Sequence, residues 1–166
     1  MYEFAVLTIL PAAVIFAAAF DLFTMTIPNR ISLALIGGFF LIAPFSSLTL
    51  VDIGWHVAAA AIVLAITFTL FAFGFLGGGD AKLATAIALW LGISNVVDFW
   101  LLATVLGGLL ALAFLSFRKL PLPFAWAEAE WIQRLHKPNG GIPYGVALAA
   151  AALLIYKDSF WFRSLG

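Results

Sequence analysis

The sequence predicts an all-α, polytopic membrane protein, and its composition and hydropathy pattern carry this prediction. Of the 166 residues, 65% are hydrophobic and 10% are charged, whereas a soluble domain contains about 25% charged and about 45–50% apolar residues. The apolar residues form long runs, separated by short polar or glycine-rich segments. One small core cannot bury so many apolar side chains, so lipid must surround most of the surface. We therefore expect a single membrane-embedded domain over residues 1–166.

The apolar runs predict about six membrane-spanning helices. A span requires about 20 residues, with a range near 17–25, so the short fourth and sixth runs fit only deep in the bundle or in a thinned bilayer. The first run follows Glu3 instead of a basic segment, which favours a retained helix over a cleaved signal peptide. The predicted spans are residues 4–23, 31–51, 55–76, 81–94, 97–117 and 142–157.

Glycine and proline mark the breaks between the spans. Pro28 disfavours helix at Ile27, so the chain turns there, and Asn29 is a good cap for the second span. Three glycines at residues 77–79 interrupt the chain before the fourth span. Further turns are expected at residues 44–47 and 92–95.

Basic residues in the loops predict the orientation of the bundle, because cytoplasmic loops are enriched in lysine and arginine. One set of loops holds Arg30, Lys82, Arg118, Lys119, Arg134 and Lys137. The other set, together with the C-terminus, holds Lys157 and Arg163. Six basic residues against two place both termini outside and the first set of loops in the cytoplasm.

The longest loop, at residues 118–141, is cytoplasmic in this orientation and contains an amphipathic segment at residues 125–135. We expect this segment to form a short interfacial helix between the fifth and sixth spans. Tryptophan suits the headgroup region, and charged side chains suit water. The residues concerned are Trp126, Trp131, Glu128, Glu130 and Arg134.

Several kinds of chemistry are not expected from this composition. The net charge is zero, with eight basic and eight acidic residues, so nothing suggests nucleic-acid binding. The absence of cysteine excludes disulfides, zinc–thiolate sites and cysteine nucleophiles. The two histidines, His56 and His136, lie far apart in the chain, so neither a metal site nor a cofactor is expected.

Two aspartates, Asp21 and Asp80, differ from the other acidic residues. Asp21 lies inside the first apolar run, and Asp80 opens a helix at the glycine-rich break. Ionisable residues within spans are costly and tend to mark function, and the predicted topology puts both at the same membrane face. Spacing alone does not show that they meet, and two unrelated helix-end caps are the alternative. The acids at the outer span ends, read as solvated interface residues, are Glu3, Asp52, Asp98 and Asp158.

A pair formed by Asp21 and Asp80 would define an acid–base reaction. Two carboxylates a few Å apart do not both ionise easily, so they share a proton. The ionised member takes a proton from water as this water attacks a peptide carbonyl, and the protonated member donates to the carbonyl oxygen. A helix N-terminus stabilises negative charge, which favours Asp80 as the base and Asp21 as the acid.

Three ordered motifs resemble those of the type IV prepilin peptidases, which are GxGD aspartic proteases. Residues 77–83, GGGDAKL, resemble the GxGD segment of this family, and residues 21–29, DLFTMTIPN, resemble its first-aspartate motif. Residues 141–145, GIPYG, resemble its Pro-Tyr-Gly element before the last helix. The resemblance implies Asp21 and Asp80 as the catalytic pair. It implies supporting roles for Pro28, Asn29, Gly77, Gly79, Lys82, Pro143, Tyr144 and Gly145.

The resemblance also implies a substrate and a location. Family members remove the short leader of type IV prepilins or pseudopilins at the cytoplasmic face of the bacterial inner membrane. The expected partners are therefore membrane lipid and a prepilin with a basic leader and a hydrophobic helix. The chain begins with the first span and lacks the cysteine-bearing N-terminal region of longer members. It therefore resembles the short, peptidase-only form found with Flp (tight-adherence) pili, and methyltransferase activity is not expected.

The roles of single residues stay open at this point. Lys82 either pairs with Asp80 or reaches a lipid headgroup. Tyr144 either hydrogen-bonds near the site or is an ordinary interface residue. Glu128 and Glu130 are candidates for steering a basic leader.

Two other functions compete with the prepilin peptidase. A presenilin-like intramembrane protease would carry Pro-Ala-Leu near the last span, where this chain has Pro143, Tyr144 and Gly145. A small transporter would use Asp21 and Asp80 as a proton or cation site, and it would transport without proteolysis.

Overall fold

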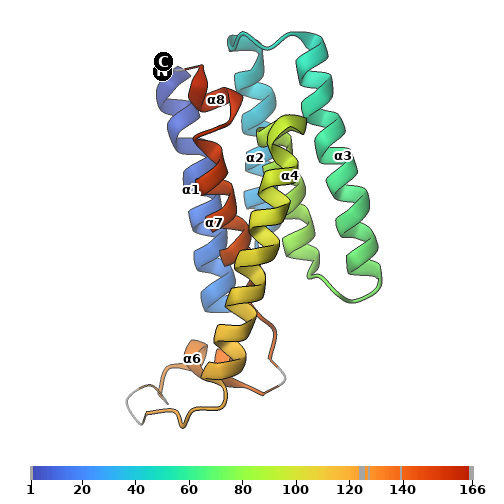
Figure 1. Ribbon diagram of the computed structural model, residues 1–166. Coiled ribbons are helices and arrows are strands. Elements are labelled where there is room, and N and C mark those ends of the chain that lie inside the picture. The colour runs from blue at the N-terminus through green and yellow to red at the C-terminus, as the bar shows by residue number, and fades with distance from the viewer. Residues whose placement is uncertain (1, 124–125, 127, 139, 165–166) are drawn as a thin grey trace.

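The structure, a computed structural model, describes residues 2–123, 126, 128–138 and 140–164, and every regular element within them is helical. The long helices are α1 (Tyr2–Thr24), α2 (Asn29–Ile42), α3 (Leu50–Ala72), α4 (Gly78–Phe117) and α7 (Tyr144–Tyr156). The short ones are the 3-10 helix η1 (Ala43–Phe45), α6 (Glu130–His136) and α8 (Phe160–Arg163). Figure 1 shows the long helices as a bundle, with α8 near one end and α6 near the other. The all-α prediction is confirmed.

Helix α4 contains two arms that the sequence predicted as separate spans. Gly92 has φ 69° and ψ 179°, a non-helical conformation with positive φ that glycine adopts without the steric cost of a side chain. The chain rises along the first arm, reverses at Gly92 and descends along the second (Figure 1). The break is therefore narrower than the predicted turn over residues 92–95, and helical structure resumes directly after it.

Four helices among the described residues are long and apolar enough to cross a membrane: Glu3–Thr24, Leu50–Ala72, Gly78–Phe117 and Tyr144–Arg163. The apolar segment Asn29–Phe45 is shorter. Large apolar side chains cover the outside of the bundle; Phe4, Leu41 and Phe68 are 74%, 73% and 62% exposed. Such a surface requires lipid around it. The protein is therefore a multi-pass membrane protein, while the number of six crossings stays a prediction.

Helix α3 begins at Leu50, earlier than the predicted start at residue 55. Thr49 and Asp52 form a capping box: the Thr49 hydroxyl accepts from the Asp52 backbone N–H, and the Asp52 carboxylate accepts from the Thr49 N–H at 2.9 Å. These bonds satisfy amide groups that the first turn of a helix leaves free. Asp52 therefore has a structural role at the start of α3.

Aromatic side chains hold the helices together at the end of the bundle near α8. Phe39 of α2, Trp90 of α4 and Trp161 of α8 are fully buried, and their ring centroids lie 5.2 to 6.1 Å apart. Trp90 Nε1 donates to the Leu35 carbonyl at 2.8 Å, and Trp161 Nε1 donates to the Trp90 carbonyl at 2.7 Å. Because buried polar groups are costly without partners, these bonds favour one packing of α2, α4 and α8.

The connection between α4 and α7 carries a shorter helix than predicted. Residues 125–135 were expected to form one continuous helix; Trp126 is helical, but Ala129 has an extended backbone with φ −84° and ψ 110°, so α6 begins at Glu130. Residues 125 and 127 of the predicted helix lie outside the described residues. Helix α6 lies at the end of the bundle where α1 and α4 finish (Figure 1).

Candidate active site

Asp21 and Asp80 line one cavity of about 460 Å³ at the end of the bundle away from α8. Asp21 lies near the end of α1, and Asp80 lies in the first turn of α4. Their side chains are close enough for the charges to interact. The other lining residues are Met25, Gly74, Phe75, Leu76, Gly77, Gly141, Ile142 and Tyr144. The structure thus brings together two acids that the sequence placed only at the same membrane face.

The Asp21 carboxylate is held by the start of α7. Asp21 is 5% exposed, and its Oδ2 atom accepts a hydrogen bond of 2.7 Å from the backbone N–H of Gly145. A Cβ atom on Gly145 would lie 2.9 Å from that oxygen and 2.8 Å from Ile27 Cδ1, so this close approach requires glycine. Gly79 at the start of α4 also packs on Ile27, where a Cβ atom would lie 3.2 Å from Ile27 Cβ. Ile27 therefore packs against the starts of both α4 and α7.

The Asp80 carboxylate has a backbone donor but also a free oxygen. The N–H of Gly77 donates to the carboxylate, and a Cβ atom on Gly77 would lie only 2.8 Å from Asp80 Oδ2. Asp80 Oδ1 is buried and has no hydrogen-bond partner among the described residues. A buried polar atom without a partner is costly. Asp80 Oδ1 is therefore available to a proton, a water molecule or a group of a substrate.

Both aspartates interact with a helix N-terminus, which changes the expectation about their separate roles. Asp80 lies in the first turn of α4, as the sequence predicted. Asp21 lies near the end of α1, but its donor Gly145 is in the first turn of α7. Because a helix N-terminus stabilises negative charge, the start of α7 favours an ionised Asp21 just as the start of α4 favours an ionised Asp80. The helix dipole therefore does not distinguish which of the two aspartates is the base and which is the acid.

Lys82 and Asn29 join the start of α2 to the first arm of α4. Lys82 Nζ donates a hydrogen bond of 2.9 Å to Asn29 Oδ1, so Lys82 pairs with Asn29 instead of Asp80. The N-cap residue of α2 is Pro28, with φ −60° and ψ 132° and no side-chain cap. The predicted capping role of Asn29 was wrong, because Asn29 is the first helical residue and its side chain engages α4.

Tyr144 lines the cavity and packs across the second arm of α4. Pro143 precedes it as the N-cap residue of α7, with φ −73° and ψ 80°. The Tyr144 ring lies so close to Gly107 that a Cβ atom there would overlap the ring. Gly107 was not predicted from the sequence, because a glycine within an apolar span has no distinguishing pattern. The cavity residues Met25, Phe75 and Ile142 were not singled out from the sequence either.

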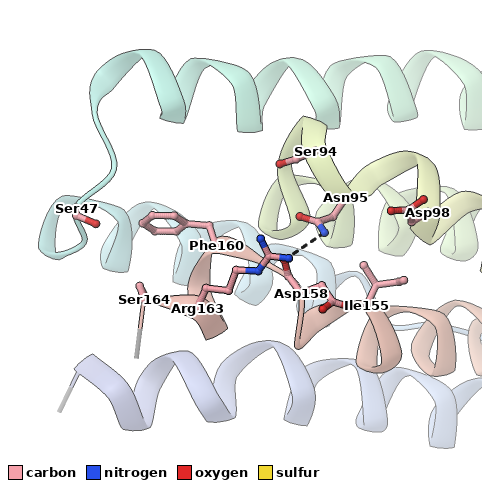
Figure 2. Close-up of a pocket in the computed structure, with 9 residues that line it drawn as sticks. All are labelled: Ser47, Ser94, Asn95, Asp98, Ile155, Asp158, Phe160, Arg163 and Ser164. Carbon is pink, nitrogen blue, oxygen red and sulfur yellow. Dashed lines mark hydrogen bonds between the residues drawn. The ribbon is translucent and has the colours of Figure 1, made fainter. Parts of the chain in front are cut away.

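A second, polar cavity of about 660 Å³ opens at the other end of the bundle beside α8 (Figure 2). Asp98, Asp158 and Arg163 are among the residues that line it. Asn95 Nδ2 donates to the backbone carbonyl of Asp158 at 3.3 Å. Asp98 and Asp158 are both exposed, in agreement with their prediction as solvated residues at span ends.

The remaining ionisable residues do not enlarge the Asp21–Asp80 site. Glu128 and Glu130 are exposed and do not line its cavity. Within the described part of the chain, no group of three or more His, Asp or Glu side chains is placed to hold a metal ion. The site contains two carboxylates, backbone donors, a tyrosine and an apolar wall, which is a set suited to proton transfer.

The fold and the site together define a multi-pass membrane protein with a paired-aspartate cavity at one end of its helical bundle. A family model for the type IV leader peptidase family matches residues 8–112, which include both aspartates. The chain therefore belongs to the type IV leader peptidase family, and the recognition made from the three motifs is confirmed. No curated protein and no solved structure matches the chain.

Proposed function

We propose that the protein is an aspartic endopeptidase that removes the leader peptide of type IV prepilins or pseudopilins of the Flp type. Asp21 and Asp80 are its catalytic pair, and the reaction is leader removal without methylation of the product. One observation supports this proposal above the others: carboxylates from distant parts of the chain line the same cavity in a member of the leader peptidase family.

The two carboxylates act as general base and general acid. In the resting enzyme they share one proton, because neighbouring carboxylates do not both ionise easily. The ionised carboxylate takes a proton from a water molecule as the water oxygen attacks the scissile carbonyl carbon, and the protonated carboxylate donates to the carbonyl oxygen. The resulting diol then collapses: the C–N bond breaks, the leaving amine takes a proton from one carboxyl group, and a diol hydroxyl returns a proton to the other.

The cavity walls suit an extended peptide. Gly77 lies on the wall that leads into α4, and Gly141 lies on the wall that leads into α7. Residues without side chains permit close approach of a peptide backbone. Met25, Phe75 and Ile142 add an apolar lining beside the carboxylates, which suits an apolar side chain near the scissile bond.

The distribution of basic residues supports a cytoplasmic position for the cavity. Lys82, Arg118 and Arg134 lie at the end of the bundle that carries the two aspartates, whereas Arg163 lies in α8 at the other end. Cytoplasmic loops are enriched in such residues. We therefore place the enzyme in the bacterial inner membrane with the cavity at the cytoplasmic face. The hydrophobic helix of the substrate then stays in lipid, and its basic leader extends on the cytoplasmic side.

Co-expression with a prepilin tests the proposal, with cleavage scored as a leader-sized mobility shift. Asp21→Ala and Asp80→Ala should each abolish the shift while the protein still inserts in the membrane. Asp98→Ala is the matched control, because Asp98 is an exposed acid of the other cavity, and it should cleave normally. Retained cleavage in either cavity variant removes that residue from the mechanism.

The same preparation separates the competing functions. Wild-type protein in proteoliposomes that transports protons or cations and leaves the prepilin intact would support the transporter. Cleavage within the hydrophobic helix of the substrate, instead of at the leader, would support the presenilin-like protease.

A further inference from the structure

Arg118 joins two points of the connection between α4 and α7 with one side chain. It is the C-cap residue of α4. Its Nε atom donates to the Leu135 carbonyl at 2.8 Å, and its Nη2 atom donates to the Gly141 carbonyl at 2.6 Å. A guanidinium group presents its donors in a fixed planar fork. Arg118 therefore holds these two carbonyl groups at a defined separation.

Gly140 packs closely against the guanidinium group. The Gly140 N–H donates to the Lys137 carbonyl at 2.9 Å. A Cβ atom on Gly140 would lie 3.3 Å from Arg118 Nη2 and 3.0 Å from the Arg134 carbonyl oxygen, so a side chain at this position would press on both. The absence of a side chain at Gly140 therefore permits its backbone to pack against the Arg118 guanidinium group.

A second arginine ties the same segment to the helix that carries Asp21. Arg134 Nη1 donates to the Phe23 carbonyl at 2.8 Å, and the rings of Phe23 and Trp131 meet edge-on with centroids 5.1 Å apart. Helix α6 is thus attached to the end of α1, while Arg118 attaches Leu135 and Gly141 to the end of α4.

The carbonyl that Arg118 holds belongs to the wall of the active-site cavity. Gly141 lines the cavity, and four residues further Gly145 donates its N–H to Asp21. The connection between them is short and stiff, because Pro143 restricts the backbone and the Tyr144 N–H donates to the Ile142 carbonyl at 2.8 Å. The position of Gly141 therefore determines where the donor to Asp21 lies.

We propose that Arg118 is a positioning residue for leader cleavage: it holds the Gly141–Gly145 wall so that Asp21 is oriented by its backbone donor. This inference rests on the proposed function. Arg118 does not line the cavity, so it acts on the catalytic geometry and not on the contact with substrate. Its loss should therefore lower kcat and leave KM nearly unchanged.

Arg118→Lys tests the proposal without removing the positive charge. A lysine ammonium lacks the fork that reaches both carbonyls, so kcat for prepilin cleavage should fall about 100-fold, as small displacements of catalytic groups can cause. KM should stay within roughly a factor of two. Lys119→Ala, at the exposed neighbouring position, is the control and should cleave like wild type. Cleavage by Arg118→Lys at the wild-type kcat overturns the proposal.

Chemical rescue and hydrogen exchange give two further readouts. Added guanidinium ions should restore part of the kcat of Arg118→Ala, and methylammonium ions should not. Backbone amides of residues 140–142, 144 and 145 should exchange faster in Arg118→Lys than in wild type. If kcat falls with neither rescue nor faster exchange, Arg118 has only a general role in stability and the inference is wrong.

The exchange measurement also separates this inference from the proposed function. Wild-type protein that fails to cleave any prepilin contradicts the proposed function. The exchange of residues 140–145 still shows in that case whether Arg118 holds the cavity wall. Should Arg118→Ala fail to insert, the kcat and the hydrogen exchange of Arg118→Lys decide whether Arg118 is a positioning residue.

Discussion

The backbone N–H of Gly145 donates a hydrogen bond of 2.7 Å to the carboxylate of Asp21, which lies 124 positions away in the chain. This bond connects the start of α7 to the end of α1 and gives Asp21 a fixed donor inside the cavity. A carboxylate that accepts such a bond has a restricted orientation, which a reaction at a fixed scissile bond requires.

Gly145→Ala should displace this carboxylate. The added Cβ atom would lie 2.9 Å from Asp21 Oδ2 and 2.8 Å from Ile27 Cδ1, so one of the neighbours must move. We expect kcat for prepilin cleavage to fall about 100-fold, as measured by initial rates in detergent or nanodiscs. Gly108→Ala, where no atom lies within 4 Å of the new Cβ, should keep the wild-type rate. Equal rates for the two variants would contradict the role given to Gly145.

Gly92→Ala should destabilise the protein at the far end of the bundle. Gly92 has φ 69°, and a Cβ atom there would lie 2.8 Å from His56 Cε1. Strain of this kind costs about 1–3 kcal/mol, so the unfolding temperature in detergent should drop. Gly54→Ala is the control, because its Cβ meets no atom within 4 Å. An unchanged unfolding temperature for Gly92→Ala would show that the reversal between the arms of α4 tolerates a side chain.

The bond between Lys82 and Asn29 should make a small, measurable contribution to stability. Its length is 2.9 Å, and the pair is exposed, so the coupling free energy should not exceed about 1 kcal/mol. A double-mutant cycle with Lys82→Met and Asn29→Ala measures it from chemical unfolding. Strictly additive effects of the two substitutions would mean that the bond does not form in the membrane.

Glu128 and Glu130 should increase the rate at which a basic leader reaches the cavity. Both are exposed, so their effect is long-range and sensitive to salt. Glu128→Gln/Glu130→Gln should lower kcat/KM about threefold at low ionic strength and have little effect at high ionic strength. Glu3→Gln, in the first turn of α1 at the other end of the bundle, should show no such change. If the double variant cleaves a basic-leader substrate at the wild-type rate in low salt, Glu128 and Glu130 do not steer the leader.

Local patterns in the chain predicted the class of the protein and singled out the two aspartates that line the cavity. Asp21 stood out because it interrupts an apolar run, and Asp80 stood out because three glycines precede it. The structure explains one of these glycines directly, since Gly77 lies where a side chain would collide with Asp80 Oδ2.

The errors occurred where a partner from elsewhere in the chain competes with a local preference. Asn29 has the chemistry of a helix cap, but Lys82 engages its side chain. The predicted continuous helix over residues 125–135 had the right amphipathic pattern, but the helix is interrupted at Ala129, and α6 begins at Glu130. A sequence pattern describes one segment at a time, so it does not predict contacts with residues from other parts of the chain.

The composition and the order of the motifs along the chain were sufficient to predict a lipid-embedded helical peptidase. Apolar content and short motifs do not depend on how the helices pack. The contacts that shape the cavity were not accessible in this way. Gly145 reaches Asp21, and Arg118 reaches Gly141, only after α1, α4 and α7 have assembled. Hydrogen bonds are effective over about 3 Å, so whether two such groups meet depends on the packing of whole helices and not on the residues beside them in the chain.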